Sequence, residues 1–388
     1  MLSGKRLRVL VVDDSVFMCR VLQNLIGSDP ELEVIGTAQD GREAITAAER
    51  LRPDVITMDI NMPRVDGLQA TEVIMSSNPR PIIMVSSDSR EGATPTLRAL
   101  GLGAVDFVAK PSTGIDFDMS TVRDELCHKL KLAARVRVVR NATRSPLAET
   151  LAAPGTAPAA SDPASATRNG AMGKPLPESI QLASWLERAP ERFPVVCLAA
   201  STGGPATLMR LLPSFPANSP AAVIVIQHMP GTFTAQFAVQ LNEVAPARVK
   251  EAEQGEPLCP GTVYICPGTH HLRISPGGRI ALDAGPRVAG YRPCADVSLE
   301  SVAQFAGAMT TAVVLTGMGS DGARGAMAVK AAGGHVITQD EATSAVFGMP
   351  AEVIRCGAAD QVLPLEQIYA AVEKRVLYSL GAARIGAI

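Results

Sequence analysis

The stretch RVLVVDDS, residues 8–15, decides the fold of the first part of the chain. Its apolar run predicts a buried strand, and an acidic pair follows where that strand ends. Four similar runs come after it, at residues 33–38, 54–59, 81–87 and 105–109, with helix-like segments at 16–26, 41–50, 67–76 and 121–136. Alternation of helices with strands this apolar predicts a doubly wound parallel sheet of five strands.

Charged side chains lie at the predicted ends of three of these strands. Asp13 and Asp14 follow the first, Asp59 ends the third and Lys110 follows the fifth. The carboxyl ends of parallel strands meet at one edge of the sheet, where open α/β folds place their sites. Three carboxylates in one crevice suit Mg²⁺, a lysine adds a positive charge, and a carboxylate can itself take a phosphoryl group. The bland alternative is a set of solvated loop acids.

The chain resumes the same alternation after residue 193. Strand-like runs lie at 194–201, 221–228, 261–267, 311–317 and 333–340, which predicts a second doubly wound, mostly parallel α/β domain. Three of them deliver Ser201, His228 and Asp321 to one edge. His228 is placed to deprotonate Ser201, and Asp321 to fix the imidazole tautomer, as in a hydrolytic triad.

Ser201 begins the segment Ser-Thr-Gly-Gly-Pro, which predicts a tight strand-to-helix turn with helix N–H groups facing the hydroxyl. Such N–H groups suit an oxyanion. Each residue also has a plainer interpretation: Ser201 as a turn or phosphate-loop residue, and His228 as a loop cap.

A competing motif overlaps Asp321. The segment Gly317-Met-Gly-Ser-Asp-Gly322 follows a strand and matches G-x-G-x-x-G, and Asp340 lies about 20 residues on, as a dinucleotide site requires. An NAD- or nucleotide-dependent enzyme is therefore one alternative, although the motif comes late in its domain and leaves Ser201 and His228 unexplained. A second alternative is a non-enzymatic regulator that binds DNA or protein, but no basic recognition element appears after residue 190.

Composition sets the broad class. A chain of 388 residues is too long for a single ordinary hydrophobic core, which favours two domains. Its composition, 47% hydrophobic and 19% charged residues, is typical of a well-packed globular protein. The formal net charge of -2 offers no general attraction for nucleic acid, and no apolar run is long enough to enter a membrane directly. Seven scattered cysteines without a CxxC pair indicate reduced thiols and a cytoplasmic location.

The middle of the chain is rich in Ala, Pro, Ser and Gly and predicts a flexible linker. We expect an N-terminal domain over residues 1–138, the linker over 139–190 and a catalytic domain over 191–388. Residues 180–188, which include the only tryptophan, Trp185, read either as a docking helix or as the first helix of the second domain.

The segments VVDDS, MDINMPRVDG, MVSS and AKP occur in order at the predicted strand ends, and together they closely resemble the receiver domain of two-component response regulators. The resemblance implies a flavodoxin-like fold in which Asp59 accepts a phosphoryl group from a chemotaxis histidine kinase. It implies that Mg²⁺ is held by Asp14, Asp59 and Asn61, with Asp13 in support. It also implies switch residues: Lys110, the aromatic Phe107, and Ser86, which we prefer to Ser87 because it directly follows the apolar run.

The segments AASTGGP, QHMPGTFTAQFA and TGMGSDGA resemble the catalytic motifs of the chemotaxis protein-glutamate methylesterase family. The resemblance implies Ser201 as nucleophile, His228 as base and Asp321 as its orienter. Thr202, Gly203 and Met318 become oxyanion or neighbouring groups.

That family demethylates glutamyl methyl esters on chemoreceptors, deamidates receptor glutamine, and needs no cofactor in its catalytic domain. It implies a receiver that covers the catalytic cleft until it is phosphorylated. A further alternative is that the chain has this fold but acts on a different receptor or in a pathway other than chemotaxis. Cys294 and Ala295 stand where a family motif, usually written RPSVD, has Ser and Val.

Overall fold

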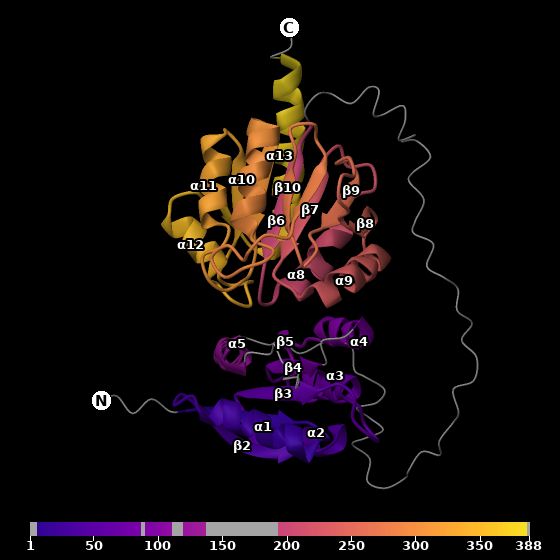
Figure 1. The fold of residues 1–388 in the computed structure, drawn as a ribbon, viewed down its shortest axis with the longest axis vertical. Helices are drawn as coiled ribbons and strands as arrows, with labels where there is room; N and C mark the ends of the chain where they lie inside the picture. The colour runs from indigo at the N-terminus through magenta and orange to yellow at the C-terminus, as the bar shows by residue number, and fades with distance from the viewer. Residues whose placement is uncertain (1–5, 87–89, 111–118, 137–192, 386–388) are drawn as a thin grey trace, which may run out of the picture.

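The computed structural model describes residues 6–86, 90–110, 119–136 and 193–385. They form two α/β domains, one above the other in Figure 1. The predicted linker over 139–190, its candidate docking helix over 180–188, and Ser87 lie outside the described residues.

The N-terminal domain is built on a five-stranded parallel sheet in the order β2-β1-β3-β4-β5, as predicted. Alternate residues of its strands are buried on opposite faces, so both faces are covered by helices: α1 and α5 on one, and α2, α3 and α4 on the other. Its elements are β1 (Leu7–Val12), α1 (Val16–Gly27), β2 (Leu32–Ala38), α2 (Gly41–Leu51), β3 (Val55–Asp59), α3 (Gly67–Ser77), β4 (Ile82–Ser86), α4 (Arg90–Gly101), β5 (Asp106–Ala109) and α5 (Met119–Ala133).

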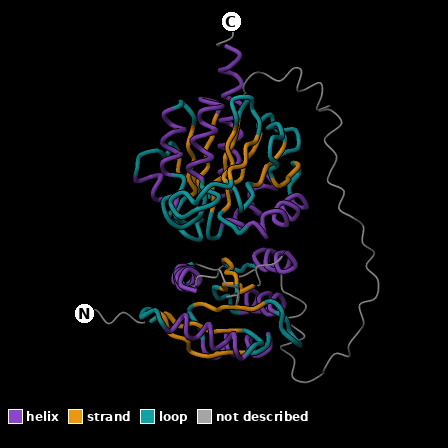
Figure 2. The backbone as a smooth tube through the Cα atoms, viewed as in Figure 1, coloured by secondary structure: helices purple, strands orange, loops and turns teal. Residues whose placement is uncertain are grey.

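The C-terminal domain has a seven-stranded parallel sheet in the order β14-β13-β12-β6-β7-β9-β8. Helices α8, α9 and α13 cover one face, and α10, α11 and α12 cover the other (Figure 2). The strands are β6 (Val195–Ala200), β7 (Ala222–Gln227), β8 (Arg248–Glu251), β9 (Thr262–Ile265), β12 (Thr310–Val314), β13 (His335–Gln339) and β14 (Gln361–Leu363). The helices are α8 (Gly204–Leu211), α9 (Gly231–Val244), α10 (Ala295–Ala306), α11 (Ala323–Ala331), α12 (Met349–Arg355) and α13 (Leu365–Ile385).

The predicted mostly parallel class is confirmed, but the sequence patterns missed three short features. Strands β8 and β14 lie at the two edges of the sheet, and an antiparallel hairpin joins β10 (His271–Ile274) to β11 (Ile280–Asp283). All are four residues or shorter, and β8 reads RVKE, so none carries the apolar run that marks the central strands.

The two domains touch along one side of each. Helix α4 of the N-terminal domain packs against α9 and α8 of the C-terminal domain, and Figure 1 shows α4, β5 and α5 facing that domain. The carboxyl ends of the central C-terminal strands lie at this side, so the residues that follow β6, β7 and β12 lie close to the contact.

Candidate functional site

The acidic residues of the N-terminal domain converge as expected from a parallel sheet. Carboxylate oxygens of Asp13, Asp14 and Asp59 all lie within 4.8 Å of one another. Lys110 Nζ lies 2.8 Å from Asp13 Oδ2 and 2.9 Å from Asp59 Oδ2. The oxygens match the ligand type that Mg²⁺ prefers, so these residues fit a magnesium site. Asn61 is exposed in the loop that follows β3.

Burial tunes this pocket. It raises the pKa of Asp59 above its ordinary value, and the bonds from Lys110 offset only part of that rise. Burial also acts to lower the pKa of Lys110, but its hydrogen bonds to Asp13 and Asp59 outweigh that effect and raise it. The protonated Lys110 beside the buried carboxylates can therefore neutralise negative charge that a bound group brings into the pocket.

Ser86 and Phe107 lie near the acidic pocket, on β4 and β5. The Ser86 hydroxyl is buried and accepts a hydrogen bond of 2.8 Å from Thr96 of α4. The Ser86 carbonyl accepts the backbone N–H of Lys110 at 2.7 Å. Phe107, two residues before the end of β5, points to the other domain: its ring lies 4.5 Å, centroid to centroid, from that of Phe233 on α9.

In the C-terminal domain, backbone bonds hold Ser201 and His228 directly past their strands. Ser201 N donates to Thr316 O at 3.0 Å, and His228 N donates to Ala200 O at 3.0 Å. The buried amide of Gln227 then donates to the carbonyls of both Ser201 (2.9 Å) and His228 (3.1 Å). Gln227 therefore links the two candidate catalytic residues, and sequence reasoning missed it.

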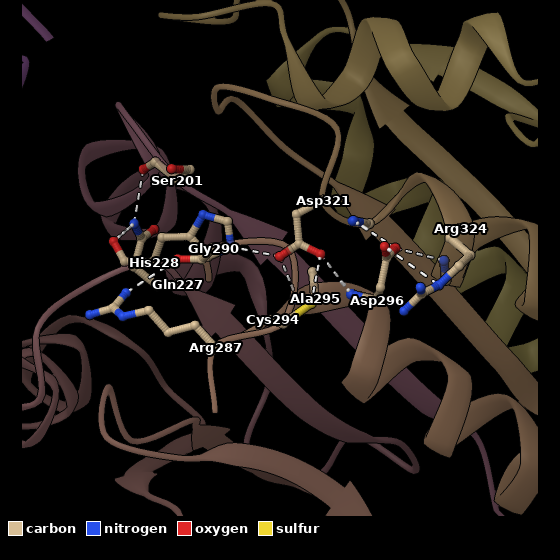
Figure 3. Close-up of polar contacts among 12 residues, drawn as sticks. Ser201, Gln227, His228, Arg287, Gly290, Cys294, Ala295, Asp296, Asp321 and Arg324 are labelled. Carbon is tan, nitrogen blue, oxygen red and sulfur yellow. Dashed lines mark hydrogen bonds and ion pairs between the residues drawn. The ribbon is translucent and has the colours of Figure 1, made fainter. Parts of the chain in front are cut away.

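His228 meets Asp321 as expected for an oriented imidazole. Its Nε2 lies 2.7 Å from Asp321 Oδ2 (Figure 3). Its ring stacks on that of Tyr291, with centroids 4.3 Å apart and planes 15° apart. Nδ1 is buried and has no hydrogen-bond partner among the described residues. Ser201 and His228 line the same pocket, and no hydrogen bond joins the Ser201 hydroxyl to this nitrogen in the described part of the chain.

Asp321 lies against the start of helix α10. Its two oxygens accept the backbone N–H groups of Ala295 at 2.6 Å and Asp296 at 2.9 Å, and the Cys294 thiol lies 3.1 Å from Oδ1. Burial acts to raise the pKa of Asp321, but the His228 hydrogen bond and these N–H groups together lower it below its usual value. The carboxylate is thus held ionised beside the imidazole.

The glycines of the loop after β12 serve close packing at this site. A Cβ on Gly317 would come within 2.8 Å of the Ser201 Cβ, so glycine lets this loop approach the residue after β6. A Cβ on Gly319 would come within 2.5 Å of the hydroxyl of Tyr291, the ring that stacks on His228. The same glycines that suggest a dinucleotide motif therefore bring the Asp321 loop against Ser201 and His228.

A cavity of about 530 Å³ lies between the domains and contains this site. Ser201, Thr202, His228 and Met318 line it from the C-terminal domain. From the N-terminal domain it is lined by residues of β5 and α5, namely Asp106, Phe107, Asp124, Glu125, His128 and Lys129.

One contact across the cavity reaches the residue beside Ser201. Burial raises the pKa of the Asp106 carboxylate, and the neighbouring Thr202 side chain lowers it in part. Lys129 also lines the cavity, but its ammonium group bonds within its own domain, where it donates to the carbonyl of Phe107 at 2.7 Å. Gly203, the N-cap residue directly before α8, has φ of 76°, a left-handed conformation that glycine adopts without strain.

The fold and the two sites define an α/β domain with an acidic pocket at its strand ends, joined to a second α/β domain with a His–Asp pair at its strand ends. Comparison with known proteins agrees. The family profile described as response regulator receiver domain matches residues 9–118, and that described as CheB methylesterase matches residues 196–372.

Two relatives bear the name protein-glutamate methylesterase/protein-glutamine glutaminase. The one from Pyrococcus abyssi is 42% identical over 99% of this chain and 98% of its own length. The one from Symbiobacterium thermophilum is 44% identical over 95% of this chain and 97% of its own length. The solved CheB methylesterase catalytic domain of Thermotoga maritima is 43% identical, covers 48% of this chain and 98% of its own, and has a TM-score of 0.46.

The chain belongs to the CheB methylesterase family, in the form that carries an N-terminal receiver domain. Within the parts of the chain that the structure describes, we find no helix with both the length and the apolar character needed to cross a bilayer.

Proposed function

We propose that this chain hydrolyses glutamyl methyl esters on chemoreceptors, releasing methanol, and deamidates receptor glutamine by the same chemistry. The relatives' names support the reaction. The observation that carries the mechanism is the 2.7 Å contact between His228 Nε2 and Asp321 Oδ2 in a pocket lined by Ser201.

In this mechanism Ser201 Oγ attacks the ester carbonyl carbon, and its proton passes to His228 Nδ1. The imidazolium that forms is stabilised by ionised Asp321, which also fixes which ring nitrogen carries the resting proton. His228 then protonates the departing methoxide, and methanol leaves a glutamyl ester on Ser201. Water, deprotonated by His228, attacks that ester, and the proton returns to Ser201 as the glutamate carboxylate is released. With glutamine as substrate, ammonia leaves in place of methanol.

The negative oxygen of the tetrahedral intermediate needs donors beside Ser201. We assign this to N–H groups around Thr202 and Gly203 at the start of α8, with Met318 as a neighbour. Two features support the assignment: Thr202 and Met318 line the cavity with Ser201, and Gly203 is the N-cap of α8, next to the first turn, where N–H groups are free of intrahelical partners.

The receiver would control this reaction through Asp59, phosphorylated by a histidine kinase. Asp13, Asp14, Asp59 and the Asn61 carbonyl would hold Mg²⁺, which when bound would neutralise charge on the phosphoryl group. Lys110 contributes the second positive charge, and Ser86 is the hydroxyl that turns to the phosphoryl oxygen. The support is the convergence of the three carboxylates and Lys110.

Phosphorylation would act by opening the contact between the domains. Asp106 lines the pocket beside Thr202, and Phe107 packs on Phe233, so β5 reaches both the catalytic pocket and the helix beside it. A receptor helix is far larger than the 530 Å³ cavity left between the domains. The resting arrangement therefore excludes the substrate, and a shift of β5 would favour an open population.

Methanol release from methylated receptors tests the function. Purified full-length chain should release methanol, and release should rise when Mg²⁺ and a small phosphodonor are added. With receptors carrying glutamine at the same sites, it should release ammonia. Absence of methanol under all of these conditions would refute the proposal.

A further inference from the structure

Asp296 makes two hydrogen bonds to the loop and helix that follow Asp321. It is the second residue of α10, and its side chain is almost fully buried. Asp296 Oδ1 accepts the backbone N–H of Gly322 at 2.9 Å and that of Gly325 at 2.7 Å. These groups lie at the start of α11, where N–H groups have no partner within the helix.

Asp321 makes the converse contact. It lies directly before the start of α11, and it accepts the N–H groups of Ala295 and Asp296 at the start of α10. Each of these two helices is thus capped by the acid that belongs to the other (Figure 3). We call this pair of exchanged caps the Asp296–Asp321 clasp.

We propose that Asp296 is a positioning residue for the hydrolysis, because the clasp fixes Asp321 at the distance and angle that His228 requires. The inference rests on the proposed function and deepens it. Asp321 is carried by a glycine-containing loop, from Gly317 to Gly322, in which Gly319 and Gly322 both have positive φ. Such a loop has little stiffness of its own, so the bonds made by Asp296 limit where Asp321 can lie.

The electrostatics argue that the contact serves more than stability. Burial raises the pKa of Asp296, the N–H bonds from α11 offset this only in part, and the charge of Asp321 adds to the rise. A carboxylate oxygen of Asp296 lies within 4.8 Å of a carboxylate oxygen of Asp321. Arg324 Nε, 3.8 Å from Asp296 Oδ2, lowers the pKa of Asp296 in part, and the desolvation and repulsion that remain are a cost that an uncharged acceptor would avoid.

The geometry supplies a matched pair of variants. Both N–H groups bond the same oxygen, so Asp296→Asn keeps one acceptor for both, while Asp296→Ala removes it. We expect Asp296→Ala to lower kcat by about tenfold or more with KM within about twofold, since small misplacements of catalytic groups cost up to about a hundredfold. Asp296→Asn should restore kcat to within about threefold of the wild type.

A second pair tests the clasp from the other acid. The buried Cys294 thiol lies 3.1 Å from Asp321 Oδ1, so Cys294→Ala removes one donor and Cys294→Ser keeps one. These variants test the donors to Asp321 alone; if Asp296→Ala fails to fold, Asp296→Ser, whose shorter side chain withdraws the acceptor, takes its place in the comparison with Asp296→Asn. The control is Glu243→Gln, which removes an exposed acid near the end of α9 in the same domain. It should leave kcat unchanged.

A spectroscopic measurement separates this inference from the proposed function. The short bond between His228 Nε2 and Asp321 should give a low-field proton resonance in the full-length protein. That signal should persist in Asp296→Asn and broaden or vanish in folded Asp296→Ala. The comparison decides on the clasp even if the wild type releases no methanol, in which case only the proposed function fails. The clasp is overturned if folded Asp296→Ala keeps both the signal and wild-type kcat, or if Asn does not restore what Ala loses.

Discussion

Replacing Asp321 by asparagine keeps the size of the side chain but exchanges one acceptor oxygen for an NH₂ donor. Both oxygens of Asp321 already accept backbone N–H groups, from Ala295 and from Asp296. Either orientation of the amide therefore turns its NH₂ toward an N–H donor. Leaving one buried donor unpaired costs about 1–3 kcal/mol, so we expect Asp321→Asn to lower the free energy of unfolding by about that amount.

The catalytic cost should be larger than the stability cost. If the NH₂ faces His228, Nε2 must become an acceptor, and the proton moves to Nδ1, the nitrogen that should receive the proton of Ser201. If the NH₂ faces the other way, the imidazolium still loses its negative partner. Loss of the orienting carboxylate in such triads lowers kcat by about 10⁴, and we expect about 10³ to 10⁴ here.

The assay is methanol release from methylated receptors with phosphodonor and Mg²⁺, at a temperature where urea unfolding shows the variant to be folded. Glu341→Gln, at an exposed acid in the same domain, is the control and should match the wild type. The pH dependence of stability adds a check. Folding lowers the pKa of Asp321, so its stabilising contribution is present above its unfolded pKa and is lost as the pH falls through the folded value. The variant should lack that loss. A kcat within tenfold of the wild type would refute the assigned role.

Three further predictions concern the receiver and its contact. Asp59→Asn should abolish the increase in methanol release caused by phosphodonor, and a retained increase would assign phosphorylation elsewhere. Phe107→Ala removes the ring that packs on Phe233, a contact of about 1 kcal/mol, so methanol release without phosphodonor should rise roughly fivefold; an unchanged rate would argue against a closed resting state. Lys110 has a raised pKa, so the stability it contributes is complete below its unfolded value of about 10.5 and is lost as the pH rises through the folded value. Lys110→Met should remove this alkaline dependence from urea unfolding curves, and a dependence equal to that of the wild type would contradict the buried ion pairs.

The candidate site residues at the strand ends could be predicted because the carboxyl ends of parallel strands lie at the same edge of the sheet. Apolar runs ending in Asp13, Asp59, Ser201 and His228 marked strand ends, and those ends meet at one edge in each domain. The His228–Asp321 contact followed from the same rule, although 93 residues separate the two.

Other parts of the site depend on contacts for which the sequence has no local signal. Nothing in the spacing of Asp296 indicates that it bonds the helix after Asp321. Gln227 offered one weak sign, a polar residue at the end of a wholly apolar strand. The contact of Asp106 with Thr202 joins two domains, and a periodic pattern within one segment carries no information about a partner in another.

The most direct test of the account compares wild-type chain with Ser201→Ala under activating conditions, with radiolabelled methyl groups on purified receptors. We predict labelled methanol from the wild type and a rate at least about 10³-fold lower from Ser201→Ala, with the receiver still able to take up phosphoryl groups. Methanol release by folded Ser201→Ala at a rate close to that of the wild type would contradict the assignment of the hydrolytic centre.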